Sequence, residues 1–474
     1  MSAVEPRSLP AGVRVVGYGT VVETESPTAE TESGRGRSSW WFFWTWLVTP
    51  HIEFGAIYVG MIVVLYLDMS LVQAVIGILL GTAFGAISHG VLTARGVQLK
   101  VPQIVLGRSA FGDLGSLIVT TMMAIISSFG WFIVNSVVAG LAINSLFGLP
   151  VVAGTAVAVV VQLFLAQIDI PFAAVQRYLF PLITLVLVVS GIIGFVKADP
   201  SVDAGQPWNL NGLIAIVVVA CIAWAYTIGW NPYATDYSKW TPVSASPRMA
   251  GVCSGLGLFI ATAFLMIIGT AAAIVVEAQG NAGEFNPTTQ FTSFLPDWLG
   301  VVVLLCLIGG SWTNNAMTLR SARTLFNVEG LGFGPRMGSL LGPIVMTVLA
   351  FLLGWAATSD LPASYEGYIM VLGVWIGPWV NIALIDTVMR RSDDPTALLY
   401  DEPSSNRWGL FALLFGISGS ILIFALQVFD GGRLPHGGVS YAALGMLAGF
   451  YLSAVVYSIG LKRLLKEKAA SRSG

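Results

Sequence analysis

Long apolar segments separated by short polar loops make up most of this chain. Stretches of about 20 or more mainly apolar residues, long enough to cross a bilayer as a helix, recur from Trp40 onward. Because these segments are too long and too continuous to be the strands of a membrane barrel, we predict an all-α integral membrane protein. The pattern predicts twelve membrane-spanning helices, at residues 40–66, 71–93, 114–142, 149–167, 174–197, 211–235, 249–276, 297–320, 336–358, 365–389, 408–429 and 438–461.

Composition and charge support this prediction. Hydrophobic residues make up 55% of the 474 positions and charged residues 10%, against roughly 25% charged residues in an average soluble protein. If both ends of the chain lie on one side, that side holds 21 of the 23 Lys and Arg residues, and the other side holds only Lys197 and Arg433. Since positively charged loops stay in the cytoplasm, we predict a multi-pass protein of the plasma (inner) membrane with both termini cytoplasmic.

Little of the chain lies outside these segments. Residues 1–38, rich in Glu, Ser, Thr and Gly, predict a disordered cytoplasmic tail, and residues 462–474 predict a basic cytoplasmic tail. Cys221, Cys253 and Cys306 are scattered through apolar spans, as expected of reduced packing residues. The sequence has no P-loop, paired CxxC or HExxH motif. We therefore expect no cofactor, no metal centre and no nucleic-acid partner.

Three classes of protein fit such a chain: a channel, an intramembrane enzyme and a secondary transporter. A channel would need a ring of like polar groups along a pore, and no repeated acidic or glycine-carbonyl filter motif occurs. An enzyme would need a nucleophile–base or metal pair, for which His51 and Glu53 are the candidates. Twelve helices without a large extramembrane domain favour the transporter.

Two of the predicted spans contain a break. The first span has "TPHIEFG", with Pro50 and Gly55, and the sixth has "GWNPYATDYSKW", with Gly229 and Pro232. Proline removes a backbone donor and glycine weakens a helix, so each stretch can unwind and expose its carbonyls. The second break lies five spans after the first, as in a transporter built from two inverted repeats of five helices. The alternative is a pair of ordinary proline kinks.

Polar positions inside the third span predict part of a ligand site. Trp131 and Asn135 are four residues apart and therefore lie on one helix face. A planar heterocycle suits this face, because stacking on an aromatic side chain is worth about 1–3 kcal/mol and the amide can bond the ring edge. Alternatively, Trp131 belongs to an interfacial aromatic belt and Asn135 bonds a neighbouring helix.

The eighth span carries a dense polar patch. Directly after two glycines, five of eight positions are polar: Ser311, Thr313, Asn314, Asn315 and Thr318. Polar groups at membrane depth need partners in protein, ligand or water. The patch therefore predicts a cavity wall, and the alternative is hydrogen bonding between helices.

Three motifs resemble those of the nucleobase:cation symporter-1 family, in its purine–cytosine permease branch. They are "VPQIVLGRSAFGDLG" (101–115), "GWNPYATDYSKW" (229–240) and "GPWVNIALIDTVMRR" (377–391). The resemblance runs from the first predicted span to residue 391. It implies a leucine-transporter-like fold, in which ten core helices form a 5+5 inverted repeat and two peripheral helices follow. The implied parts are a transport core at 39–391, with repeats at about 39–197 and 211–391, and the peripheral helices at 392–461.

The resemblance also implies site residues. The family's stacking tryptophan and amide fall on Trp131 and Asn135, and its sixth-span ring contact falls near Tyr226 or Thr227, with Trp224 beside them. Its eighth-span polar residues fall on Thr313, Asn314 and Thr318. From the polar patch we add Asn315 as a substrate contact and Ser311 as a coupling residue. Sodium-coupled relatives use a Ser-Thr hydroxyl pair here, but this chain has Trp312–Thr313, and an indole offers a cation no lone pair.

Glu53 and His51 are unusual residues for the interior of an apolar span. An ionised side chain at the bilayer centre costs about 2.5–3.5 kcal/mol, so such residues usually serve function. Burial disfavours the charged form of both groups, which is a property that a proton carrier needs. Alternatively, both bond the substrate ring, or both lie near the membrane interface.

We therefore hypothesise symport of a nucleobase, cytosine or a purine, with Glu53 as the proton carrier and coupling residue. The predicted substrate contacts include His51 and Glu53 themselves, and the cation is a proton or sodium ion. Sodium-coupled or uncoupled uptake of hydantoin, allantoin or a thiamine-like compound is the alternative.

Overall fold

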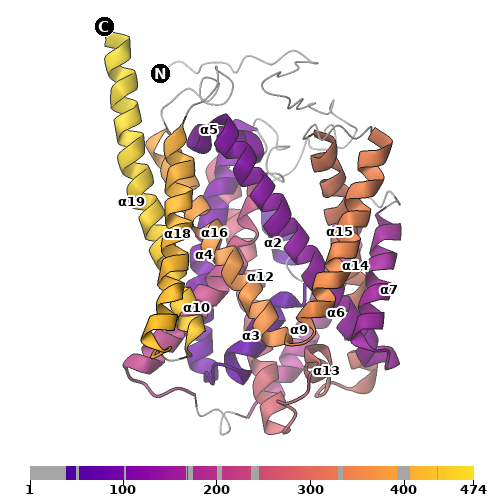
Figure 1. Cartoon of the computed structure of the whole chain (residues 1–474). Helices are drawn as coiled ribbons and strands as arrows, with labels where there is room; N and C mark the ends of the chain where they lie inside the picture. The colour runs from indigo at the N-terminus through magenta and orange to yellow at the C-terminus, as the bar shows by residue number, and fades with distance from the viewer. Residues whose placement is uncertain are drawn as a thin grey trace.

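The protein folds into a bundle of helices (Figure 1). The computed structural model describes residues 39–49, 53–100, 103–166, 168, 174–199, 205–235, 245–328, 335–391, 406–434 and 436–473, and these form helices and connecting turns without a β-strand. The helices are α2 (Ser39–Val48), α3 (Gly55–Leu65), α4 (Leu71–Leu99), α5 (Gln103–Met122), η2 (Met123–Phe129), α6 (Gly130–Phe147), α7 (Val151–Leu165), η3 (Val175–Leu179), α9 (Phe180–Lys197), α10 (Leu210–Ile228), η4 (Asn231–Tyr233), α12 (Pro247–Ala278), α13 (Pro287–Thr292), α14 (Asp297–Val328), α15 (Pro335–Ala357), α16 (Leu361–Met389), α18 (Arg407–Asp430) and α19 (Gly438–Ser473).

Each predicted apolar segment overlaps one, two or three of these helices. Nine helices in the described ranges are long and apolar enough to cross a membrane. Three further apolar helices are shorter, at Gly55–Leu65, Val151–Leu165 and Ile344–Ala357. The chain is therefore an all-helical, multi-pass membrane protein, while the count of twelve crossings stays a prediction.

Both predicted helix breaks are present. Helix α2 ends at Val48 and α3 begins at Gly55, and Glu53, which lies between them, is not helical. Residues 50–52, which include His51, lie outside the described residues. Helix α10 ends at Ile228, and the chain continues through a turn into the short 3-10 helix η4. Proline at the second position of η4 explains why the α-helix stops before it.

The third predicted span is longer and less regular than the sequence pattern indicated. Helical structure already begins at Gln103, inside the first family motif, and Gly112 interrupts it with a φ of 69°. The chain then passes through a π-helical turn, η2, before α6 begins at Gly130. A π-helical turn shifts the faces of the helix that follows it, and such turns are frequent at functional sites. Trp131 is the second residue of α6.

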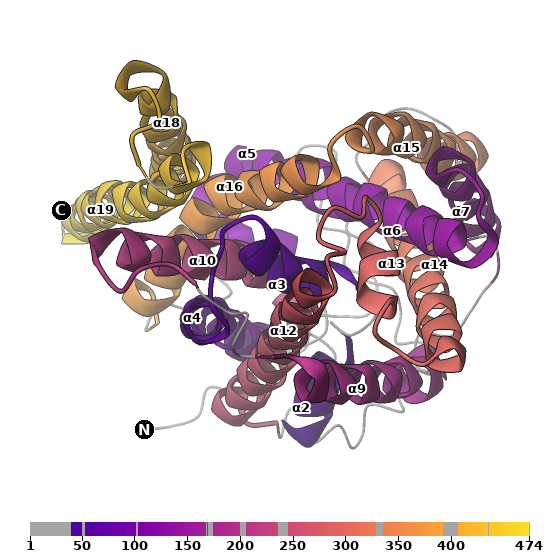
Figure 2. The same cartoon turned by 90° about the horizontal axis from the view of Figure 1, so that it is seen from below.

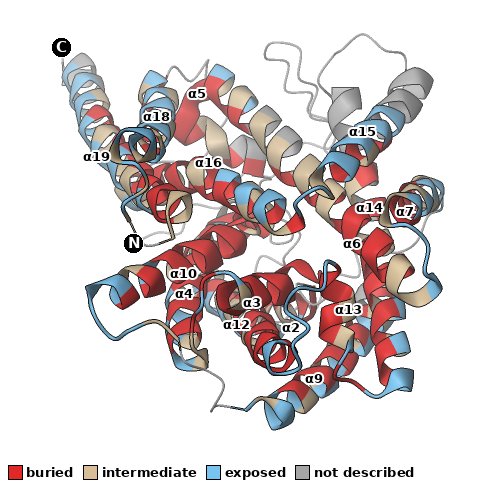
Figure 3. Cartoon of the chain, turned by 60° about the horizontal axis from the view of Figure 1, so that its bottom comes forward, coloured by how far each residue is buried: buried red, intermediate tan, exposed pale blue. Residues whose placement is uncertain are grey.

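Close packing of small residues holds the centre of the bundle together. A Cβ atom added to Gly60 of α3 would lie 1.8 Å from the Met266 carbonyl oxygen of α12, and one added to Gly81 of α4 would lie 2.1 Å from the Ala220 carbonyl oxygen of α10. Glycine therefore lets these backbones touch. Viewed from below, α3 lies in the middle of the molecule between α10 and α12, and α18 and α19 lie at one edge (Figure 2). The burial pattern agrees, since α3, α10 and α12 are mainly buried while α18 and α19 are largely exposed (Figure 3).

Candidate functional site

The Glu53 carboxylate lies in the first helix break and is 2% exposed. One carboxylate oxygen, Oε1, accepts a hydrogen bond of 2.7 Å from the Asn314 side-chain amide of α14. The other, Oε2, accepts one of 3.2 Å from the Tyr226 hydroxyl of α10. A buried carboxylate needs such partners to offset its lost hydration. Glu53 therefore joins the first break to α14 and to the last turn of α10.

Aromatic rings surround this carboxylate. The Trp131 ring of α6 meets the Tyr226 ring edge-to-face, with centroids 5.4 Å apart at 83°, and the Tyr368 ring of α16 at 5.3 Å and 88°. Tyr365, one turn before Tyr368, lies over Gly55, where an added Cβ would be 2.6 Å from its hydroxyl oxygen. That hydroxyl is buried and has no hydrogen-bond partner among the described residues. It is therefore available to a ligand.

Asn135 lies one turn after Trp131 on α6 and is 1% exposed. Its side chain is close enough to the Glu53 carboxylate to interact with it, yet within the described part of the chain its amide nitrogen makes no hydrogen bond of normal geometry. The structure thus brings Asn135 to this carboxylate and Trp131 to the Tyr226 ring whose hydroxyl bonds it, and the Asn135 amide nitrogen retains donor capacity. A ring placed against Trp131 could be bonded along its edge by this donor.

A cavity of about 220 Å³ adjoins these residues. It is lined by Phe54 and Gly55 next to Glu53, by Gly130 next to Trp131, and by Tyr365 and Tyr368 of α16, together with apolar side chains of α6 and α15. Glu53 and Trp131 themselves do not line it. Ligand sites are typically apolar with a few convergent polar groups, and this space suits a small, flat molecule.

The polar patch of α14 divides between two roles. Asn314 bonds Glu53, whereas the Asn315 amide donates to the Phe132 carbonyl at 2.8 Å and to the Ser136 hydroxyl at 3.1 Å, both on α6. Asn315 therefore joins α14 to α6. This is the hydrogen bonding between helices that was the alternative interpretation of the patch. The Thr313 hydroxyl bonds the Gly309 carbonyl of its own helix at 2.7 Å.

Two further hydroxyls complete the patch. Thr318 donates to the Asn314 carbonyl at 3.1 Å, which is also a bond within α14. The Ser311 hydroxyl is buried and has no partner in the described ranges. Of the predicted residues of this helix, Asn314 is thus the one that contacts the carboxylate. Ser311 has a buried hydroxyl without a partner among the described residues, and the Asn315 side-chain oxygen is also buried without one.

Of the three predicted residues of the sixth span, Tyr226 faces the carboxylate and the other two point elsewhere. The Thr227 hydroxyl bonds the Ala223 carbonyl at 2.7 Å, and its side chain lies against Gly85 of α4. The Trp224 ring contacts Phe84 and Phe450, with centroids 5.7 and 5.3 Å away. Successive residues on a helix point about 100° apart. Because Tyr226 faces the carboxylate, Thr227 beside it on α10 points in another direction.

Sequence reasoning missed Tyr365 and Tyr368 on α16. Their spacing of three residues places both on one face of the helix, in the stretch "SYEGYIM" at the start of the tenth predicted span. Two tyrosines on one face of an otherwise apolar span are the signal that could have found them. Nothing local, however, shows that this face turns toward Glu53.

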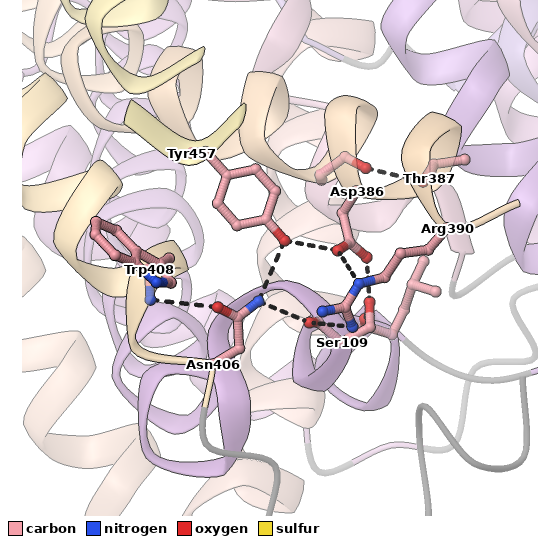
Figure 4. A network of polar contacts seen from close by, with 9 residues as sticks. Ser109, Asp386, Thr387, Arg390, Asn406, Trp408 and Tyr457 are labelled. Atoms are coloured by element: carbon pink, nitrogen blue, oxygen red, sulfur yellow. Dashed lines mark hydrogen bonds and ion pairs between the residues drawn. The ribbon is translucent and has the colours of Figure 1, made fainter. Parts of the chain in front are cut away.

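Two of the quoted motifs meet in a second buried network (Figure 4). The Asp386 carboxylate of α16 accepts hydrogen bonds from the Ser109 hydroxyl of α5 and, at 2.6 Å, from the Tyr457 hydroxyl of α19. Arg390, the residue directly after the end of α16, pairs with Asp386 at 3.4 Å and donates to the Ser109 carbonyl at 3.1 Å. Asn406 donates to the same carbonyl at 3.1 Å. This network fastens the end of α16 to α5, α18 and α19, away from Glu53.

Comparison with solved structures supports a transporter fold. The inward-facing conformation of Mhp1 superposes with a TM-score of 0.68 at 17% identity, over 90% of this chain and 92% of that one. Mhp1 in a closed conformation with bromovinylhydantoin bound, described as a nucleobase-cation-symport-1 family transporter, gives 0.62 at 18% identity, over 91% and 94%. A manganese transporter of Eremococcus coleocola gives 0.51 at 12% identity, over 94% and 99%. These likenesses concern the fold alone.

A bundle of membrane helices with two broken helices around a buried carboxylate and an aromatic site defines the class of membrane transporters. The chain belongs to the family of permeases for cytosine/purines, uracil, thiamine and allantoin, which it matches over residues 30–437. It is also 22% identical over 331 residues to the candidate purine-cytosine permease YxlA of Bacillus subtilis (strain 168), across 68% of this chain and 69% of that protein. These relatives are permeases and transporters rather than enzymes, in agreement with the prediction.

Proposed function

We propose that this chain imports a nucleobase, cytosine or a purine, together with a proton, by alternating access. The observation that carries the proposal is the Glu53 carboxylate, held by Asn314 and Tyr226 beside the Trp131 ring. A carboxyl group can exchange a proton and can also bond an amidine-like ring edge. Substrate and proton would then use one group, which couples their movements.

In this proposal Trp131 supplies the stacking surface and Asn135 the edge contact. Stacking of a base on an aromatic side chain contributes about 1–3 kcal/mol, and the unused Asn135 donor would select rings with an acceptor at the matching edge. A ring that lacks this acceptor would leave a buried donor unpaired, which a hydrogen-bonding site penalises strongly. Tyr365 and Tyr368 would cover the ring from α16.

The proposed architecture extends the observed one. It has twelve crossings, with a ten-helix core in two inverted repeats at about 39–197 and 211–391 and peripheral helices at 392–461, and both termini lie in the cytoplasm. The two helix breaks at corresponding positions support the repeats. The distribution of Lys and Arg supports the orientation in the plasma membrane.

Sodium coupling is the second candidate, and it is supported by a buried hydroxyl on α14. The buried Ser311 hydroxyl has no partner within the described residues, and Thr313 is near it on α14. Against sodium, Trp312 occupies the position of one hydroxyl ligand, and its indole has no lone pair for a cation. The substrate alternatives are hydantoin, allantoin and a thiamine-like compound.

Uptake of labelled cytosine and adenine tests the proposal. We expect saturable uptake that a protonophore abolishes and that sodium removal leaves unchanged. Uptake that does not depend on the proton gradient but stops without sodium would show that sodium, and not a proton, is the coupling cation. A competition panel of unlabelled nucleobases, hydantoin, allantoin and thiamine against one labelled base identifies the ring that is carried.

A further inference from the structure

A second cavity, of about 770 Å³, lies between α16 and its neighbours α18 and α19, which stand at the edge of the molecule (Figure 2). The two cavities share no lining residue among those described. Tyr365 and Tyr368 of α16 line the cavity of the proposed substrate site, whereas Glu366 and Gly367 line the second one. Helix α16 therefore forms a wall of both cavities.

The lining of the second cavity follows one face of α16 over about half the thickness of a membrane. Its residues recur at every third or fourth position from Ala363 to Trp375, a spacing that marks one helix face. From residue 363 to residue 375 a helix rises by about 18 Å, and one leaflet contributes about 15 Å of hydrocarbon. Ala363 lies in the first turn of α16, which is the outer end in the proposed orientation. The cavity therefore matches one acyl chain of the outer leaflet in length.

The second cavity is apolar and can be reached from the bilayer. Val371 of α16 and Ile421 and Phe424 of α18 line it and are exposed at its rim. Because α16 and α18 are both long and apolar enough to cross a membrane, these exposed side chains face lipid in a membrane. An acyl chain can therefore enter the cavity sideways without passing through water.

Glu366 is the one charged side chain among the described residues that line this cavity. It lies in the second turn of α16, near the outer membrane surface in the proposed orientation, and is half-buried. Within the described part of the chain it makes no hydrogen bond or ion pair, and the charged group that interacts with it, Asp360, is also acidic. Arg433, in the connection between α18 and α19, pairs with Asp430. The Glu366 carboxylate can therefore accept a cation from outside the chain.

We propose that this cavity binds a phosphatidylethanolamine molecule of the outer leaflet, with its ammonium group on Glu366 and one acyl chain along α16. A primary ammonium has N–H donors for a charge-assisted hydrogen bond to the carboxylate. The quaternary ammonium of phosphatidylcholine has no N–H donor, and the headgroup of phosphatidylglycerol has no cation. The bound chain would support α16, the helix that carries Tyr365 and Tyr368 to the substrate site. The inference goes beyond the proposed function and takes from it the orientation in the membrane alone.

Native mass spectrometry of the full chain tests the headgroup. The probes are equal amounts of phosphatidylethanolamine and phosphatidylcholine with the same palmitoyl and oleoyl chains. We expect the wild type to retain one phosphatidylethanolamine with a preference of about fivefold, the upper value for a partly exposed ion pair. Glu366→Gln should bind both lipids equally. Glu277→Gln, which removes an exposed acidic group near the end of α12, should keep the preference.

A second pair of variants tests the path of the acyl chain. A Cβ atom added to Gly367 meets nothing within 4 Å, so Gly367→Phe places a ring in the cavity without a clash at its first atom. We expect this variant to lose the retained lipid. Gly283→Phe, where an added Cβ also meets nothing within 4 Å, should keep it. Thermal unfolding in phosphatidylcholine alone checks that each variant is folded, and Glu366→Gln decides if Gly367→Phe is not.

Three outcomes would overturn the proposal. Equal retention of the two lipids by the wild type, or a preference that survives in Glu366→Gln, would show that Glu366 does not bind the headgroup. Retention of the lipid by folded Gly367→Phe would show that the acyl chain lies outside this cavity. Because the measurement is of bound lipid and not of uptake, its failure does not affect the proposed transport function, and a failure of nucleobase transport does not affect this site.

Discussion

The Asn314 side chain donates a 2.7 Å hydrogen bond to the Glu53 carboxylate, although 261 residues separate the two in sequence. This bond joins the break in the first span to the middle of α14. A carboxylate that exchanges a proton would weaken and strengthen this bond in turn. Through this contact, protonation of Glu53 would therefore change the hydrogen bonding of a second helix, α14.

Replacing Glu53 with glutamine should separate exchange from accumulation. Glutamine keeps the size and an oxygen acceptor for Asn314, but it cannot carry a proton. We expect Glu53→Gln to exchange nucleobase at equal pH and to lose the accumulation of about tenfold per pH unit that one proton provides. Glu277→Gln, at an exposed position near the end of α12, is the control. Gradient-driven accumulation by Glu53→Gln would show that Glu53 is not the coupling residue.

Removing the Asn314 amide should weaken transport through Glu53. Hydrogen bonds to charged groups contribute about 1.5–3 kcal/mol, so we expect Asn314→Leu to lower kcat/KM for uptake by about 10- to 150-fold. Asn211→Leu, at an exposed position in α10, should leave uptake unchanged. Equal uptake by both variants would show that the bond to Glu53 has no part in transport.

Truncating Trp131 should reduce substrate affinity. The loss of a stacking surface worth about 1–3 kcal/mol raises the dissociation constant by about 5- to 150-fold. Binding of labelled base to purified Trp131→Ala measures this directly. Trp298, on α14 and 68% exposed, offers a matched tryptophan, and Trp298→Ala should bind normally. Unchanged binding by Trp131→Ala would show that the substrate ring does not stack on Trp131.

The Asp386 network should matter for stability. Asp386→Asn leaves the Arg390 charge uncompensated, and breaking a buried ion pair costs about 3–5 kcal/mol. Arg433→Gln breaks the exposed pair with Asp430, where the Arg433 and Asp430 side chains are 84% and 40% exposed and the loss is below about 1 kcal/mol. Thermal unfolding of the purified variants should therefore give a clearly lower midpoint for Asp386→Asn alone. Equal midpoints would contradict the structural role of the network.

Gly60 should tolerate no side chain. Its missing Cβ would lie 1.8 Å from the Met266 carbonyl oxygen, so Gly60→Ala forces α3 away from α12. Overpacking of this kind costs about 1–3 kcal/mol, and the midpoint of thermal unfolding should fall. An added Cβ at Gly367 meets nothing within 4 Å, so Gly367→Ala should unfold like the wild type. A stable Gly60→Ala variant would show that these helices can separate without loss.

The sequence by itself determined the features that depend on local pattern. Hydropathy located the helices, because apolar length is what a membrane crossing requires. The Pro and Gly residues located both helix breaks, since their effect on the backbone acts within one turn. Trp131 and Asn135 were placed on one face by their spacing, and Glu53 was singled out by its charge within an apolar segment.

Only the tertiary structure decided which of several adjacent polar residues meet. Asn314 rather than Asn315 bonds Glu53, and Tyr226 rather than Thr227 faces it, because helix rotation settles these choices and neighbouring helices set that rotation. Tyr365 joins the site, and Ser109 meets Asp386, through contacts between distant segments. Sequence periodicity defines the faces of a helix, but the packing of its neighbours decides which face turns inward.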